Sequence, residues 1–298
     1  MSATNESPKG PPSGPPDEST KGPPNHASVS DHELKELVRE RFTKTAQVFG
    51  DYAVAERVAE AELLARLVAA GPEDVAVDLA SGPGTLALRF AKHVRWMCAY
   101  DLTPAILLRA RHKAAHEGLL EKLGFAIGDA QTLPFADGSL DLAVTSYSLH
   151  HISDPARVIH EMARVVKRGG RVGLIDIVVP EDPKVRELNH RIEWIRDHSH
   201  CRSLTLAEFR AIMDAAGLRI TATETREHPR VFEHWMHVAG WKSSDAEFIE
   251  ARRLMVSSMA DDGANFHPRF EPADVCQPGA QPCLYMINTG IQIAAEKI

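Results

Sequence analysis

Apolar residues in this chain fall into short continuous runs, separated by segments in which they recur every three or four positions. Continuous runs have the composition of buried strands, and the helical spacing is typical of amphipathic helices. The expected strands are 74–79, 95–100, 124–128, 140–146 and 171–179. The expected helices between them are 84–93, 104–117 and 155–166. This alternation predicts an α/β fold, with a doubly wound, mostly parallel sheet covered by helices on both faces.

The pattern after residue 200 predicts one more helix and two more strands. Thr205-Leu-Ala-Glu208 is a capping box, whose first and last side chains pair with backbone N–H groups, and a helix follows it to Ala216. Strand-like runs then cover 218–225 and 284–294, which brings the expected sheet to seven strands. We interpret residues 226–278 as an insertion before the last strand.

The N-terminal region divides into a polar tail and a helical part. Residues 1–28 are rich in Pro, Gly and Ser and have almost no large apolar side chains, so we expect a disordered tail. Ser30 or Asp31 is placed to cap a first helix that runs through Phe42. A second amphipathic helix is expected over 54–70.

Length and composition describe an ordinary globular protein. The 298 residues suit one domain, for which we take 29–298, with 29–70 as an N-terminal helical cap. A net charge of -7 without a basic, aromatic face argues against nucleic acid as a partner. No apolar run reaches the roughly 18 residues of a membrane span, so we expect neither a span nor a signal peptide.

The cysteines bear on the compartment. Their scattered positions contain no Cys-x-x-Cys pair, and we interpret all of them as reduced thiols of a cytoplasmic protein: Cys98, Cys201, Cys276 and Cys283. A bridge between Cys276 and Cys283 is the less favoured alternative. The oligomeric state is left open, and a homodimer is one of the alternatives.

A glycine turn follows the first expected strand. Gly82 and Gly84 stand between that strand and a helix, where glycines let the backbone approach a ligand and the helix presents free N–H groups. Asp101 ends the second strand, close to the offset of about 20 residues at which an acidic residue takes a ribose hydroxyl pair. Asp129-Ala130 ends the third strand, where an adenine amino group could be met. Each residue alone also suits a plain turn, but parallel strands bring all of them to one edge.

Longer motifs carry a resemblance to a known family. They are Val77-Asp-Leu-Ala-Ser-Gly-Pro-Gly84, Asp101, Gly128-Asp-Ala-Gln-Thr-Leu-Pro-Phe135, Asp137-Gly-Ser-Leu-Asp-Leu-Ala-Val144, Ser148-Leu-His-His151 and Glu161-Met-Ala-Arg-Val-Val-Lys-Arg-Gly-Gly170. Over about residues 40–225 the chain resembles class I S-adenosylmethionine-dependent methyltransferases, nearest to the ubiquinone/menaquinone-biosynthesis type (methyltransferase type 11) and its small-molecule relatives. Quinone-acceptor members usually carry an Arg-Asn pair near His150-His151, and this departure argues against a quinone acceptor.

The resemblance implies a Rossmann-like methyltransferase sheet with an antiparallel last strand, S-adenosyl-L-methionine as cofactor and a set of cofactor-binding positions. The methionine moiety would be held by Ala80, Gly82 and Gly84, the ribose by Asp101 and Leu102, and the adenine by Asp129 and Ala130. The sulfonium would lie beside Ser146 and Tyr147. A covering segment would contain Thr45 and Tyr52.

Two histidines are candidates for a general base, which an acceptor with an acidic proton would need. His151 follows the fourth strand and His200 lies in Asp197-His-Ser-His200. Each also fits a structural interpretation, His151 as a cap or packing residue and His200 in a turn held by its own hydrogen bonds. Asp176 would bind the acceptor or lock a loop. We expect no metal site, because neither a cysteine cluster nor a His-Glu-x-x-His pattern occurs.

The sequence therefore predicts methyl transfer to a small-molecule acceptor, with the acceptor atom unresolved. One alternative is a nicotinamide-dependent oxidoreductase, because Gly82-Pro-Gly-Thr-Leu-Ala87 also matches the Gly-x-Gly-x-x-Ala fingerprint. Another is a nucleotide-binding regulatory protein without turnover. We expect the insertion 226–278, which contains Trp235 and Trp241, to shape or cover the acceptor pocket.

Overall fold

The structure is a computed structural model that describes residues 30–272 and 282–298. Within its first helix, the side chains of residues 45–56 lie outside the description. The expected disordered tail, 1–28, also lies outside the described residues. No helix in the described ranges is both long enough and apolar enough to cross a bilayer.

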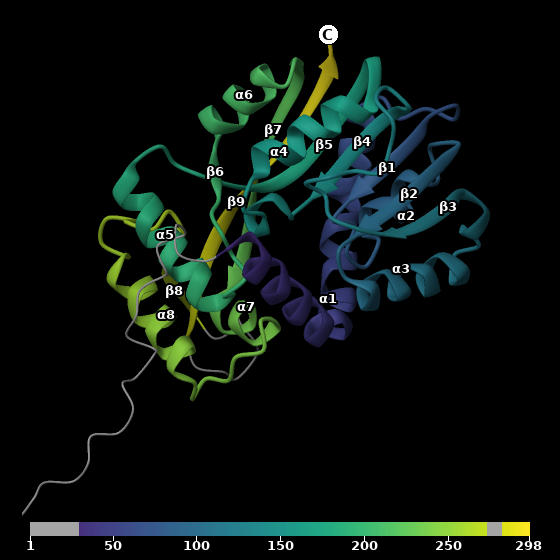
Figure 1. The fold of residues 1–298 in the computed structure, drawn as a ribbon. Helices are drawn as coiled ribbons and strands as arrows, with labels where there is room; N and C mark the ends of the chain where they lie inside the picture. The colour runs from purple at the N-terminus through teal and green to yellow at the C-terminus, as the bar shows by residue number, and fades with distance from the viewer. Residues whose placement is uncertain (1–29, 273–281) are drawn as a thin grey trace, which may run out of the picture.

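The central sheet has the strand order β3-β2-β1-β4-β5-β9-β7 (Figure 1). Its strands are β1 (Val75–Leu79), β2 (Trp96–Asp101), β3 (Leu123–Ile127), β4 (Leu140–Ser146), β5 (Val166–Val179), β7 (Leu218–Val231) and β9 (Cys283–Lys297). The first five pair in parallel, whereas β9 lies antiparallel between β5 and β7. The doubly wound sheet with an antiparallel last strand is thus confirmed. Two short strands extend it, β6 (Leu204–Thr205) beside β5 and β8 (Arg269–Glu271) beside β9.

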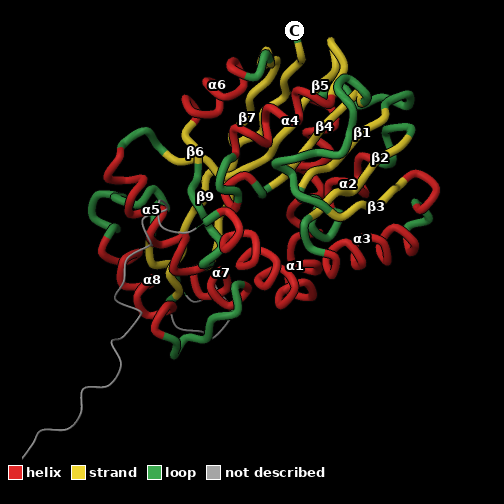
Figure 2. The backbone as a smooth tube through the Cα atoms, in the orientation of Figure 1, coloured by secondary structure: helices red, strands yellow, loops and turns green. Residues whose placement is uncertain are grey.

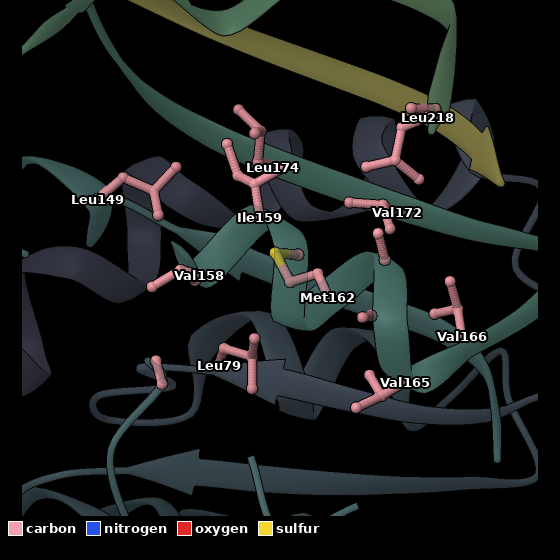
Figure 3. Packing of buried hydrophobic residues seen from close by; sticks show 14 of the residues in the cluster. Leu79, Leu149, Val158, Ile159, Met162, Val165, Val166, Val172, Leu174 and Leu218 are labelled. Carbon is pink, nitrogen blue, oxygen red and sulfur yellow. The ribbon is translucent and has the colours of Figure 1, made fainter. Parts of the chain in front are cut away.

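Helices cover both faces of the sheet because side chains alternate along each strand. Val77 and Leu79 of β1 face one apolar cluster with the helices α4 (Pro155–Val165) and α6 (Leu206–Ala215). Figure 3 shows α4 side chains of this cluster around Leu79 and Leu174. Ala76 of β1 faces the other cluster, which α1 (Asp31–Leu67), α2 (Thr85–Phe90) and α3 (Pro104–His116) complete.

A third apolar cluster lies beyond the parallel part of the sheet. It joins the helices α5 (Pro183–Arg196), α7 (Phe232–Val238) and α8 (Ala246–Ser257) to Leu284 and Met286 of β9. Figure 2 shows these three helices gathered at one end of β9, away from β1, β2 and β3. The chain between β7 and β9 therefore builds its own small core against α5.

Two strands are longer than the sequence pattern predicted. β5 begins at Val166 rather than at 171, because Val166 pairs with Leu140 across a β-bulge. β7 continues beyond 225, because its ladder with β9 extends to the pair Val231 and Tyr285. Backbone pairing prolongs a strand past the residues whose side chains show the period.

The two expected N-terminal helices form a single helix, α1, so the predicted break over 43–52 is wrong. No proline interrupts this stretch, and the one interior glycine, Gly50, costs only about 1 kcal/mol in a helix. The expected cap is confirmed: the Ser30 side chain accepts from the Glu33 N–H, and Glu33 in return accepts from the Ser30 N–H.

The expectation of four reduced cysteines is corrected at Cys283, which is disulfide-bonded. Cys98 and Cys201 are free and buried, as expected. The sequence interpretation relied on local spacing, whereas a disulfide needs only two Cα atoms about 4.4–6.8 Å apart, which the fold decides.

Candidate functional site

A pocket with an empty volume of about 960 Å³, open mouth included, lies at the carboxyl ends of β1, β2, β3 and β4. The N-terminal part of α1 covers it through Leu34, Val38 and Phe42. Most of the residues singled out from the sequence line this pocket: Ala80, Gly82, Asp101, Leu102, Asp129, Ala130, Ser146, Tyr147 and His151. Such an edge is where open α/β sheets bind their ligands.

Two of the other singled-out residues, Gly84 and His200, are not part of this lining. Gly84 stands directly behind it as the N-cap of α2. His200 is buried, with 2% of its surface exposed, and is separate from the lining. The side chains of Thr45 and Tyr52 lie outside the described part of α1, so their covering role stays a prediction.

The glycine turn has the backbone geometry that a tight ligand loop needs. Gly82 and Gly84 have φ angles of 56° and 78°, and the non-glycine Ala80 before them has φ 50°. Asp101 holds the turn, because its carboxylate accepts from the N–H of Gly82 and from the N–H of Thr103, both at 2.8 Å. The Thr103 side chain and the Leu102 N–H also hydrogen-bond to this carboxylate.

Asp101 provides a direct test of the pocket. We expect Asp101→Ala to weaken binding of S-adenosylhomocysteine 10- to 100-fold, because hydrogen bonds to a charged group contribute about 1.5–3 kcal/mol. Isothermal titration calorimetry measures the loss. Asp214→Ala, at an exposed position on α6, is the matched control and should bind as the wild type does. Equal affinities in the two variants would contradict the placement of the ligand beside Asp101.

Asp78 is a buried carboxyl group beneath the turn. One of its oxygens accepts from the Ser81 hydroxyl at 2.7 Å and from the Ala87 N–H at 3.1 Å. The second hydrogen bond gives a partner to a backbone amide in the first turn of α2. Burial raises the pKa of Asp78 to about 7, despite these two hydrogen bonds. The sequence showed Asp78 only as part of a strand.

This raised pKa predicts a pH-dependent stability. In the unfolded chain Asp78 ionises near pH 3.9, so the folded protein holds one more proton between about pH 4 and 7. The contribution of Asp78 to the free energy of unfolding is fully present below pH 4 and is lost as the pH rises to 7. Relative to Asp78→Asn, wild-type stability should fall by about 1 kcal/mol per pH unit in this window, measured by urea unfolding. A difference that does not vary with pH would show that Asp78 is ionised throughout.

Asp129, expected from the sequence to lie on the adenine side, is tied to α1. Lys35 of α1 approaches an Asp129 carboxylate oxygen at 2.6 Å and also pairs with Asp31 one turn earlier. Asp31 accepts from the side chains of Gln131, at 3.0 Å, and Ser153. We call these five residues the α1 latch. The sequence showed the Asp31–Lys35 spacing but nothing about partners so far along the chain.

Tyr147 is anchored on the side of the pocket that faces α1. Its φ of 49° is unusual for a bulky residue, and such strain concentrates at functional sites. Its hydroxyl donates to the buried Glu60 carboxylate at 2.9 Å and lies 3.2 Å from His228 Nε2. The Arg57 guanidinium lies 4.1 Å from the ring centroid. Burial raises the Tyr147 pKa, and Glu60 raises it further, so the phenol stays neutral. Sequence reasoning missed these three partners, because they come from α1 and β7.

The short helix η4 (Leu149–His151) sets the direction of the two adjacent histidines. Asp176 accepts from the Leu149 N–H at 2.8 Å and pairs with His150 Nδ1 at 2.5 Å, so it locks this loop, one of the two roles considered for it. His151 lines the pocket, and Phe42 of α1 meets its ring edge-on at a centroid distance of 5.3 Å. No group of three or more His, Cys, Asp or Glu side chains in the described ranges is arranged to hold a metal.

Comparison with known proteins identifies this arrangement. A family model described as a methyltransferase domain matches residues 77–174. The uncharacterized methyltransferase YcgJ of Bacillus subtilis is 31% identical over 199 residues, 67% of this chain and 78% of that protein. Its crystal structure superposes with a TM-score of 0.70 at 28% identity, covering 80% of this chain and 98% of that one. The demethylmenaquinone methyltransferase of Corynebacterium efficiens is 34% identical over 112 residues, 38% of this chain and 45% of that protein.

Proposed function

This chain belongs to the class I S-adenosylmethionine-dependent methyltransferases, and we propose that it methylates a small organic acceptor bound beneath α1. The observation that carries the proposal is one pocket that joins the glycine turn, Asp101 and Asp129 to His151 and to the apolar side chains of α1.

The residues around the turn fit the cofactor. Asp78 Oδ1 and Thr85 Oγ1 are buried and bond to no described residue, although buried oxygens normally have partners. These two oxygens are suited to bind the ammonium and carboxylate groups of an amino acid. S-adenosylmethionine carries both groups at its methionine end. Asp101 suits the ribose hydroxyls. When bound, S-adenosylmethionine supplies an electrophilic methyl group on a positively charged sulfur.

The cover that α1 forms supports a small acceptor. Leu34, Val38 and Phe42 close the pocket with apolar surface, and Arg57 and Tyr147 border it further along. We place both the cofactor and the acceptor in this pocket, whose empty volume of about 960 Å³ includes its open mouth. Holding the two in line can supply about 7–11 kcal/mol of the barrier by orientation alone.

Of the two histidine candidates, we propose His151 as the general base. It lines the pocket, whereas His200 lies behind His150 at a centroid distance of 5.4 Å. Burial and the neighbouring His150 lower the pKa of His151 to about 4, so its imidazole is neutral at pH 7 and can accept a proton.

The sheet argues against the oxidoreductase alternative. Dinucleotide-binding Rossmann sheets have six parallel strands in the order 3-2-1-4-5-6, whereas here β9 enters antiparallel between β5 and β7. The regulatory alternative predicts cofactor binding without turnover. It has no observation in its favour beyond the pocket itself.

The test combines binding and turnover. Calorimetry should show S-adenosylhomocysteine binding and no NADH binding. Incubation of the protein with S-adenosylmethionine carrying a labelled methyl group, in a metabolite extract of its source cells, should then give a labelled small molecule by mass spectrometry. Binding of NADH instead would overturn the proposal. Cofactor binding with label found only on protein or nucleic acid, or on nothing, would overturn the small acceptor.

A further inference from the structure

A chain of hydrogen bonds connects His151 to a carboxylate outside the pocket. His151 Nδ1 lies 3.0 Å from the Ser199 carbonyl oxygen and 3.1 Å from the Ser199 hydroxyl. The Ser199 hydroxyl lies 2.6 Å from Asp197 Oδ1, which also accepts from the Ser199 N–H at 3.0 Å. Asp197 and Ser199 are buried, with 4% and 2% of their surfaces exposed.

The protons in this chain can be assigned. An ionised carboxylate only accepts, so the single hydroxyl proton of Ser199 is donated to Asp197. The Ser199 carbonyl also only accepts. His151 Nδ1 faces these two acceptors and must therefore carry a proton, which leaves the lone pair of the neutral ring on Nε2.

Asp197 is held in its ionised form. Burial alone would raise its pKa, but the charge of Arg41, the hydrogen bond from the Ser199 hydroxyl and the charge of Arg196 keep that pKa well below its usual range. Arg41 Nε of α1 lies 3.0 Å from Asp197 Oδ2, so each oxygen of the carboxylate has a defined partner.

The other edge of the His151 ring carries Nε2. His151 is half-buried and lines the cavity, and Nε2 bonds to no described residue. Phe42 packs edge-on against the ring, with an interplanar angle of 88°. Arg41 and Phe42, adjacent on α1, thus fix Asp197 and His151 respectively, so the cover of the pocket also orients the base.

We infer that Asp197 and Ser199 are positioning residues that hold His151 as its Nδ1–H tautomer, and that the acceptor carries an acidic O–H or S–H, as in a phenol, an enol or a thiol. The inference rests on the proposed function. In the step, the acceptor oxygen or sulfur bonds to the methyl carbon as the methyl–sulfur bond breaks and leaves its electron pair on the cofactor sulfur. The acceptor proton passes to His151 Nε2.

The class of acceptor follows from which functional groups need a general base to react. A neutral amine attacks through a lone pair that it already has, and a carboxylate is ionised at neutral pH, so neither requires an aligned Nε2. An acidic hydroxyl or thiol becomes a much better nucleophile when its proton is removed as the new bond forms.

Nitrogen-15 NMR of the protein without cofactor tests the positioning part. Long-range ¹H–¹⁵N spectra distinguish the two tautomers, and the spectrum of His151→Gln assigns the His151 signals. The wild type at pH 7 should show Nδ1–H. An Nε2–H form or an imidazolium in the wild type would overturn the inference, whatever the variants do.

Variants separate positioning from general structure. Asp197→Ala should shift His151 towards the Nε2–H form, which free histidine prefers. It should also lower kcat at least 10-fold with S-adenosylhomocysteine affinity unchanged. Ser199→Ala keeps the carbonyl acceptor and should have a smaller effect, which Ser199→Thr restores. Asp182→Ala removes a comparable cap at the other end of α5 and should leave the tautomer unchanged. An Asp197→Ala protein that keeps the wild-type tautomer and kcat would contradict the role.

The bond in the labelled product tests the acceptor class. A methyl ether or a methyl thioether supports it, whereas an N-methyl, C-methyl or methyl ester product would overturn it. If no small molecule is methylated, the proposed function fails, and the NMR result still decides whether Asp197 and Ser199 set the tautomer.

Discussion

Replacement of His151 by glutamine is expected to lower kcat by about 10²- to 10⁴-fold, the usual contribution of a general base. Glutamine can still donate a hydrogen bond towards Ser199, but its amide cannot take a proton from the acceptor. His151 lines the pocket, and we propose that it contacts the acceptor rather than the cofactor, so S-adenosylhomocysteine affinity should stay within about threefold of the wild type. Steady-state kinetics with the acceptor found in the labelled extract gives the first quantity, and calorimetry the second.

The control for this prediction is His160→Gln. His160 is exposed on α4, where its Nδ1 pairs with the Ala156 carbonyl of its own helix at 2.8 Å. That variant should turn over as the wild type does. Full kcat in His151→Gln would show that the acceptor loses its proton to water and that His151 only lines the pocket.

The second large effect concerns stability, in Gly84→Ala. At a φ of 78° an alanine costs about 1–2 kcal/mol, and its Cβ would stand 2.8 Å from Ala110 Cβ and 3.4 Å from Ala110 Cα. The second atom belongs to the backbone of α3, so relief requires α2 and α3 to separate, which typically costs another 1–3 kcal/mol. We expect about 2–5 kcal/mol of lost unfolding free energy in urea, together with weaker S-adenosylhomocysteine binding.

Gly118→Ala isolates the two contributions. Its φ of 68° imposes a similar conformational cost, but an added Cβ there would meet nothing within 4 Å. We therefore expect a loss of only about 1–2 kcal/mol and unchanged ligand affinity. If the two variants were equally destabilised, the close approach of α2 to α3 would not be the reason for glycine at position 84.

The part of the pocket that we assign to the cofactor was predictable because it depends on local order. Asp101 and Asp129 were found from strand ends alone, since parallel strands deliver their carboxyl ends to one edge wherever the helices pack. The capping boxes at Ser30 and Thr205 likewise involve residues three positions apart, so the sequence displays both partners together.

The part of the pocket that we propose for the acceptor could be predicted only incompletely. His151 was a candidate from the sequence, but only its place in the pocket distinguishes it from His200. Its ring is oriented by Ser199, which lies 48 positions later in the chain. The same holds for Gln131 and Asp31 of the α1 latch, which are 100 positions apart. Hydrophobic period and local motifs carry no information about such pairs.

The sequence by itself determined the alternation of strands and helices, the glycine turn and the edge at which Asp101 stands, because each follows from residues adjacent along the chain or from the handed, parallel βα unit. Only the tertiary structure decided that α1 is one helix lying over the pocket, and that Arg41 and Phe42 reach Asp197 and His151. These contacts join segments whose packing depends on the whole apolar core, and no short stretch of chain encodes that.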